Sequence, residues 1–205
     1  MAERRFQGLL VDFGGVLTTN IWSSFDAFCS SEGLDRGTVR ELFRGDGEAL
    51  ALLRRLERGA VTDEEFERDF GAMLGVEPGG LIERLFAGLG PDEAMIEAVE
   101  AARAQGIRTG LISNSWGTGI YERAPLDIFD ASVISGDVGL HKPQPEIFHL
   151  GAERLGVEPG CCVFVDDLRE NVEGAEAVGM HGVLHRETDE TIARLRELLR
   201  VELAA

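Results

Sequence analysis

The chain has 205 residues, of which 44% are hydrophobic, and a formal net charge of −17 at neutral pH. This length and composition suit one domain with an insertion, or one domain with a smaller second lobe, and they allow a sizeable core. The negative charge argues against nucleic acid or an anionic membrane as the main partner, because phosphate groups would be repelled over most of the surface.

The sequence contains no apolar run long enough to cross a bilayer, and its charged N-terminus has no long apolar segment behind it. We therefore expect a cytoplasmic protein. The three cysteines, Cys29, Cys161 and Cys162, are odd in number and lack metal-site spacing. We interpret them as reduced, small hydrophobic residues.

The first predicted element is a buried strand over about residues 6–12, in which an apolar run ends at Asp12. A run that is apolar on both faces is typical of a parallel sheet. Gly14 and Gly15 follow before the chain becomes apolar again. Alone, Asp12 has two interpretations: it caps a turn, or it is a charged group delivered to the end of a strand.

The next part of the chain, from residue 18 to residue 89, has the pattern of helices. Apolar residues recur there at helical spacing, and Thr62 with Glu65 fits a capping box. Gly88 to Pro91 then interrupts the chain. We expect an all-helical cap domain over 18–89, inserted into a core made of residues 1–17 and 90–205.

Beyond this interruption, helices and strands alternate. The expected strands cover residues 107–113, 131–135, 161–165 and 181–184. The expected helices include a short one after Ser113, one over 143–155, one over 169–178 and one at the C-terminus. Such alternation predicts right-handed crossovers and an α/β fold, a doubly wound, Rossmann-like parallel sheet covered by helices on both faces.

Polar side chains follow the predicted strands. In an open parallel sheet, ligands bind at the carboxyl ends of the strands, so these side chains should meet there. Taken singly, each group has an ordinary structural explanation as a helix cap, a helix-opening acidic pair or a solvated charge. Their joint occurrence favours a site made of Asp12, Ser113, Asn114, Lys142, Asp166 and Asp167.

The carboxylates of this predicted site require a cation. Two carboxylates about 4 Å apart repel by roughly 4 kcal/mol at an effective dielectric constant near 20, so Asp12, Asp166 and Asp167 would not all stay ionised alone. Ligation by oxygen atoms, without a group of His or Cys residues, is the pattern of Mg²⁺.

A magnesium site of this kind would serve to hold a phosphoryl group. Ser113 and Asn114, at the start of a predicted helix, and the ammonium of Lys142 would hold it together with the metal. Lys142 is the single lysine beside 19 arginines, which suggests a position that requires a compact ammonium. Asp12 would then lie beside the phosphorus as the nucleophile.

The motifs resemble those of the haloacid dehalogenase-like hydrolase superfamily over essentially the whole chain. They lie at residues 11–17, 111–114, 139–148 and 163–167, the last followed by Asn171 and Gly174-Ala175. The resemblance implies a phosphatase-type enzyme with a small helical cap. It also implies roles for individual residues: Asp12 as nucleophile, Asp12, Asp166, Asp167 and the carbonyl of Gly14 as metal ligands, and Ser113 and Lys142 as phosphate-binding groups.

The sequence departs from this family pattern at Gly14. Phosphatases of the superfamily usually have a second aspartate there, which protonates the leaving group and later activates water. General acid–base catalysis contributes about 10²–10⁴-fold, so its loss would slow turnover unless another group replaces it. Thr18, Thr19, His141 and an acid from the cap are the candidates, and the sequence does not choose among them.

The leading functional hypothesis is a Mg²⁺-dependent hydrolase of a small phosphorylated metabolite that forms an aspartyl-phosphate. One alternative is a metal-independent 2-haloacid dehalogenase, which the Asp166-Asp167 pair disfavours because it would repel a carboxylate substrate. The other is a weakly active binding or regulatory protein. The sequence does not define the oligomeric state or which cap residues face the site; the candidates are Trp22, Phe25, Arg40, Phe43 and Arg44.

Overall fold

The computed structural model describes residues 5–45, 47–114, 121 and 126–203. In this part of the chain, five parallel strands form one sheet in the order β3-β2-β1-β4-β5. The first strand, β1, therefore lies between two strands that come much later in the chain, as in a doubly wound fold. The strands are β1 (Gly8–Val11), β2 (Arg108–Ser113), β3 (Ala131–Ile134), β4 (Cys162–Asp166) and β5 (His181–Leu184).

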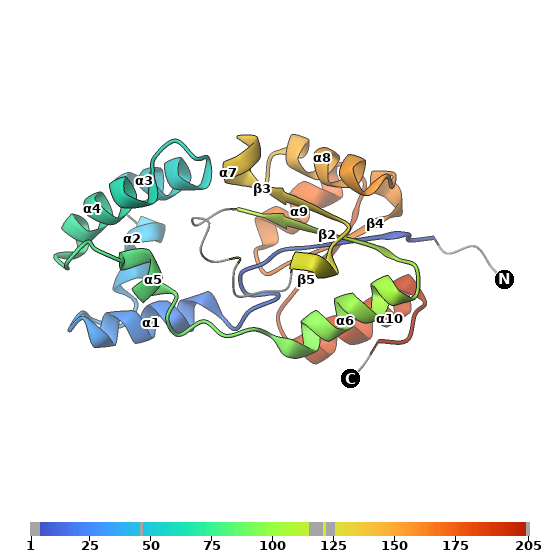
Figure 1. Ribbon diagram of the computed structural model, residues 1–205, viewed down its shortest axis with the longest axis horizontal. Coiled ribbons are helices and arrows are strands. Elements are labelled where there is room, and N and C mark those ends of the chain that lie inside the picture. Colours follow the sequence, from blue (N-terminus) through green and yellow to red (C-terminus); the bar gives the residue numbers. More distant parts are fainter. Residues whose placement is uncertain (1–4, 46, 115–120, 122–125, 204–205) are drawn as a thin grey trace.

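Helices cover both faces of the sheet, which confirms the predicted fold class (Figure 1). Helices α6 (Glu93–Ala104) and α10 (Thr188–Leu199) pack on one face, and α8 (Pro145–Leu155) and α9 (Arg169–Ala177) on the other. Side chains alternate between the faces along each strand, so Leu9 and Val11 enter the first core and Leu10 the second. This explains why β1 is apolar at every position.

Five helices lie between β1 and α6 and pack around an apolar core of their own (Figure 1). Phe70 is at the centre of this core, with its ring 4.8 Å from that of Phe43 and 5.3 Å from that of Phe66. The predicted capping box is confirmed, since Thr62 and Glu65 exchange side-chain to backbone hydrogen bonds. The helices are α1 (Ile21–Ser31), α2 (Thr38–Gly45), α3 (Gly47–Glu57), α4 (Asp63–Leu74) and α5 (Leu81–Leu85).

The chain enters and leaves this helical layer through two adjacent segments. Thr18 forms an antiparallel bridge with Pro91, and the Thr19 amide donates to the Gly90 carbonyl at 2.8 Å. Paired linkers beside a separate apolar core support a domain division at 17/18 and 89/90. We retain this division as a proposal.

Helix boundaries differ from expectation at two places. Helix α8 begins at Pro145 rather than at residue 143, because a proline favours an extended residue before it and Gln144 has φ −61° and ψ 133°. A short helix, α7 (Ser135–Val138), follows β3 and was not predicted. Short 3₁₀ turns cover Leu126–Ile128 and Pro159–Cys161. The short helix expected after Ser113 would fall on residues outside the described part of the chain.

All three cysteines are free thiols, with Cys29 and Cys162 buried. Among the described residues, the helices lack the length and apolar character that spanning a membrane requires.

The packing of Phe70 gives a test of the helical layer. Because its side chain has no exposed area, we expect Phe70→Ala to lower the free energy of unfolding by about 3–5 kcal/mol, measured by urea denaturation. Phe70→Leu, which keeps most of the volume, should cost less. A loss from Phe70→Ala below about 1 kcal/mol would contradict this packing.

Candidate functional site

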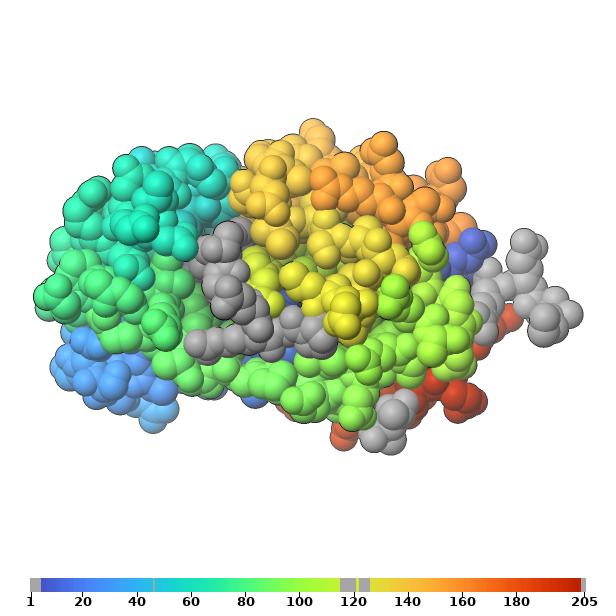
Figure 2. Space-filling view, in the orientation of Figure 1, coloured from blue at the N-terminus to red at the C-terminus, as the bar shows by residue number. Residues whose placement is uncertain are grey.

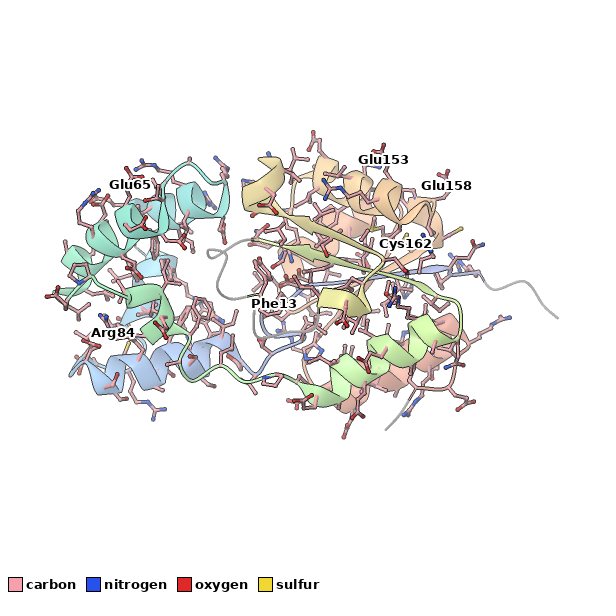
Figure 3. The ribbon with its side chains drawn as sticks, in the orientation of Figure 1. Phe13, Glu65, Arg84, Glu153, Glu158 and Cys162 are labelled. Carbon is pink, nitrogen blue, oxygen red and sulfur yellow. The ribbon has the colours of Figure 1, made fainter. Side chains whose placement is uncertain are left out.

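The two central strands bring carboxylates together at one edge of the sheet. Val11 of β1 pairs with Val165 of β4, so Asp12 and Asp166 follow at the same level. The Asp12 amide donates to the Val165 carbonyl at 2.9 Å, which fixes this register past the end of β1. Carboxylate oxygens of Asp12, Asp166 and Asp167 all lie within 4.8 Å of one another. Figure 3 shows Phe13, the next residue after Asp12, on the side of the sheet that faces the helical layer.

The Lys142 ammonium lies between two of these carboxylates. Its Nζ is 2.6 Å from Asp12 Oδ1 and 2.6 Å from Asp166 Oδ2, and its side chain is 1% exposed. Burial alone would lower the pKa of Lys142, but Asp12 and Asp166 outweigh this effect and hold the pKa above its usual range. Lys142 is therefore a charged group inside the protein, and its compact ammonium fits between the two acids.

Asp166 is oriented by several donors. The Leu168 amide donates to its Oδ1 at 2.9 Å, and the Asn171 side-chain amide donates to both carboxylate oxygens at 3.0 and 3.1 Å. With Lys142 on Oδ2, both oxygens are engaged, and Asp166 positions Lys142. Asn171 was not among the predicted site residues. A polar residue on the buried face of α9, five positions after Asp166, was the signal for it.

Ser113 and Asn114 approach Lys142 from the other side of β1. The Asn114 side chain accepts from the Lys142 amide at 2.9 Å and donates to the Lys142 carbonyl at 3.2 Å. It therefore holds the Lys142 backbone, and its predicted role in binding substrate stays a prediction. Ser113 Oγ accepts from the hydroxyl of Tyr121 at 3.1 Å, a partner that the sequence did not indicate. The helix expected to start at Ser113 and Asn114 would continue into residues outside the described part of the chain.

A cavity of about 600 Å³ lies over these groups, between the sheet edge and the helical layer. Asp12, Ser113, Asn114, Lys142 and Asp167 line it from the core. Of the five cap residues considered from the sequence, Trp22, Phe25, Phe43 and Arg44 line the cavity. The fifth, Arg40, instead has its guanidinium 5.2 Å from the Trp22 ring centre and 3.8 Å from Asp26.

The carboxylates carry more negative charge than Lys142 balances. Burial raises the pKa of Asp12 to about 7, with further increases from Asp166 and Asp167 and an opposing effect of Lys142. Burial and then Asp166 raise the pKa of Asp167 to about 6. Three acids beside one ammonium therefore suit an additional cation, and the oxygen donors suit Mg²⁺. Since Asp166 is engaged, Asp12 and Asp167 are the carboxylates most available to such an ion.

The two glycines after Asp12, Gly14 and Gly15, occupy positions where a side chain would meet different neighbours. Gly15 has φ +77°, and a Cβ atom there would lie 2.9 Å from Asp167 Oδ2, so a side chain would be strained and would crowd that carboxylate. A Cβ atom on Gly14 would lie 2.4 Å from Ile21 Cδ1 of α1. Ile21 therefore occupies the space in which an aspartate at position 14 would stand.

Comparison with known proteins places this site in a family. The chain is 27% identical over 203 residues to a sesquiterpene phosphatase of Aspergillus oryzae, covering 95% of this chain and 97% of the fungal one. It is also 27% identical over 207 residues to mouse acyl-CoA dehydrogenase family member 10. That match covers 96% of this chain but only 19% of the mouse protein, so the chain spans about a fifth of its length.

The fold has solved counterparts as well. A haloacid dehalogenase family enzyme of Bacteroides thetaiotaomicron, crystallised with magnesium and inorganic phosphate, superposes with a TM-score of 0.68. It is 21% identical and covers 88% of this chain and 94% of its own. The model of the haloacid dehalogenase-like hydrolase family matches residues 6–179, which contain every residue of the site described above. The chain belongs to the haloacid dehalogenase-like hydrolase family and is an enzyme of the hydrolase class.

Proposed function

We propose that this hydrolase is a Mg²⁺-dependent phosphatase that cleaves phosphomonoesters of small metabolites through an aspartyl-phosphate. One observation carries the proposal. The Asp12 carboxylate opens into a cavity beside a buried ammonium and a second carboxylate, Asp167, and the excess of negative charge there fits a divalent cation.

The residues have distinct proposed roles. Asp12 attacks the phosphorus, and Lys142 and Ser113 hold the phosphoryl oxygens. Asp166 and Asn114 keep Lys142 in place through its side chain and its backbone. Asp12, Asp167 and the Gly14 carbonyl would hold Mg²⁺, which would supply positive charge to offset the repulsion between Asp12 and the phosphate. The fungal relative named as a phosphatase and the structural neighbour with magnesium and phosphate support this proposal.

The cavity also favours a class of substrate. The wall that the helical layer contributes is mostly apolar. Charged residues of this wall, which include Arg44, Arg54 and Arg58, are fewer than its apolar residues. We propose that the organic part of the substrate is apolar and packs against this wall, which consists of Ile21, Trp22, Phe25, Phe43, Leu50, Leu53, Phe86 and Leu89. The name of the fungal relative, a sesquiterpene phosphatase, agrees with such a group.

The two alternative functions make different demands on the site. A 2-haloacid dehalogenase would bring a carboxylate substrate beside three acids that share one ammonium, which is electrostatically unfavourable. The arginines of the cavity lining, Arg44, Arg54 and Arg58, belong to the helical layer. A binding or regulatory protein would hold a phosphate ester without turnover. Gly14, which provides no acid two residues after Asp12, is the observation in favour of the binding or regulatory alternative. The phosphatase therefore requires that another residue supplies the proton.

The first prediction concerns the nucleophile and the metal. We expect Asp12→Asn to abolish hydrolysis of an aryl phosphate, because the amide cannot form the acyl-phosphate. A chelator should abolish the activity of the unaltered protein, and added Mg²⁺ should restore it. Colorimetric release of the phenol measures both. Hydrolysis that persists in EDTA, or in a pure Asp12→Asn preparation, contradicts the mechanism, whereas binding of phosphate esters without turnover favours the regulatory alternative.

The second prediction concerns the buried ammonium. Lys142→Met leaves its acidic partners unbalanced, so we expect the metal-free protein to lose about 3–5 kcal/mol of unfolding free energy at about pH 8. The folded-state pKa of Asp12 is already raised to about 7, and without Lys142 it lies further above the unfolded value near 4. The cost of the substitution therefore grows as the pH rises above about 4 and is smaller at about pH 5.

Chemical denaturation at the two pH values measures the effect of Lys142→Met. Arg194→Met is the control, because it removes one cation from an exposed ion pair with Glu197 and should cost less than about 1 kcal/mol. Equal losses from Lys142→Met at the two pH values would contradict the electrostatic explanation.

The third prediction concerns the substrate. Along n-alkyl phosphates from butyl to octyl, each buried methylene contributes about 0.8 kcal/mol, so kcat/KM should rise roughly three- to fourfold per methylene until the cavity is filled. Phosphate release measures it, with glycerol phosphate as the polar control. Leu53→Asp, on the apolar wall, should flatten the series. A flat series in the unaltered protein, or a preference for glycerol phosphate, would overturn the assignment of an apolar organic group.

A further inference from the structure

Asp12 and Asp167 have other proposed roles, as nucleophile and metal ligand, so neither is free to protonate the leaving oxygen. Gly14 cannot do so, and Ile21 fills the space beside it. A substrate with an alkyl leaving group needs this proton, because an alkoxide is a poor leaving group in water. The proton must therefore come from another residue that lines the cavity.

The two threonines near Asp12 are poorly placed for this role. The Thr18 hydroxyl accepts from the Gly15 amide at 2.9 Å and donates to the Thr19 carbonyl at 3.1 Å, so its proton is engaged. The Thr19 hydroxyl accepts from the Gly90 amide in the linker to the helical layer. Neither residue lines the cavity.

His141 lines the cavity but is not suited to be the acid. The Arg58 guanidinium donates to its Nε2, which must therefore be unprotonated. The ring proton then lies on Nδ1, which is buried and has no hydrogen-bond partner among the described residues. His141 remains the rival to be tested.

Glu57 is the carboxylate that the helical layer contributes to the cavity lining. It is the last residue of α3, and this end of the helix is attached to the core. The Glu57 carbonyl accepts from the Ser135 hydroxyl at the start of α7, and the next residue, Arg58, bonds to His141. Figure 1 shows the end of α3 beside α7, and Figure 2 shows the helical layer in contact with the core there. Glu57 is thus held at the junction of cap and core.

The environment of Glu57 favours exchange of a proton near neutral pH. Burial raises the pKa of Glu57 to about 7. Lys142, Arg54 and Arg58 oppose this increase, and Glu170 of α9 adds to it. A group that first gives and then takes a proton works best when its pKa lies close to the operating pH.

We propose that Glu57 is the general acid and base of this site, in place of an aspartate at position 14. The inference rests on the proposed phosphatase function. In the first step Asp12 attacks the phosphorus, the bond to the alkyl oxygen breaks, and that oxygen takes the proton of Glu57 and leaves as the alcohol. In the second step the Glu57 carboxylate removes a proton from water, whose oxygen attacks the aspartyl-phosphate. The bond to Asp12 breaks, and inorganic phosphate leaves with Glu57 protonated again.

The test compares leaving groups. An alkyl phosphate needs the proton, whereas p-nitrophenyl phosphate releases a stable phenolate, and kcat/KM reports the steps up to release of the leaving group. We expect Glu57→Gln to lower kcat/KM by about 10²–10⁴-fold for octyl phosphate and by less than about tenfold for p-nitrophenyl phosphate. The decrease in octyl phosphate kcat/KM as the pH rises through about 7 should be present in the unaltered protein and absent in Glu57→Gln.

Two control variants make the comparison specific. Glu173→Gln removes an exposed carboxylate of α9 that does not line the cavity and should change the ratio between the two kcat/KM values less than about threefold. His141→Asn tests the rival donor and should leave the ratio similarly unchanged. Glu57→Asp, with a shorter reach, should lower octyl phosphate hydrolysis selectively and serves as the second variant if Glu57→Gln does not fold, as judged by its unfolding midpoint.

The outcomes separate this inference from the proposed function. Suppose that Asp12→Asn is inactive but that Glu57→Gln and Glu57→Asp lower kcat/KM equally for both substrates, or for neither. The proposed phosphatase function then stands and the role of Glu57 is overturned. If His141→Asn instead lowers kcat/KM selectively for octyl phosphate, the proton comes from His141, and the role of Glu57 is again overturned. If Asp12→Asn retains activity, the proposed function itself fails.

Discussion

The buried ammonium of Lys142 is the interaction on which the site depends. Two carboxylates, Asp12 and Asp166, lie 2.6 Å from it, almost entirely out of water. Without this charge, three acids gathered at the end of a parallel sheet would repel one another more strongly, and the pKa of Asp12, already raised to about 7, would be higher still. With it, they remain an incompletely balanced group. That remaining imbalance is what makes the site suitable for a divalent cation and a phosphoryl group.

The order of the strands explains why these residues meet. Because β1 lies between β2 and β4, the ends of three strands that are far apart in the sequence become neighbours. Asp12 stands between Ser113 on one side and Asp166 on the other, and Asn114 reaches the backbone of Lys142 from β2. The parallel sheet thus places the proposed nucleophile, its counter-charge and the groups that orient this charge on one rigid edge.

Local sequence patterns were enough to predict much of the core and of the site. The remaining residues were not predicted, and the reasons can be identified. Asp12 and Asp166 were predictable because each ends an apolar run, and strand ends converge in an open parallel sheet. Asn171 had a local signal, since it follows Asp166 by five positions on the buried face of α9. The contact of Tyr121 with Ser113 depends on packing that no local pattern encodes. The same is true of Glu57, whose burial arises only where α3 meets α7.

The leaving group needs a proton, and two positions could supply it: an aspartate in place of Gly14 on the core, or Glu57 on the helical layer. An acid two residues after the nucleophile sits on the core and is present whether or not the cap covers the site. An acid at the end of α3 belongs to the helical layer, and Ile21 from the same layer fills the space that the core acid would need. In this arrangement a helical layer in place over the cavity would both exclude water from Asp12 and supply the proton for the leaving group. Hydrolysis of an alkyl phosphate would then require the cap–core contact, and the apolar wall proposed to bind the substrate is on the same layer. Selection of the substrate and protonation of its leaving group would thus be properties of one structural unit.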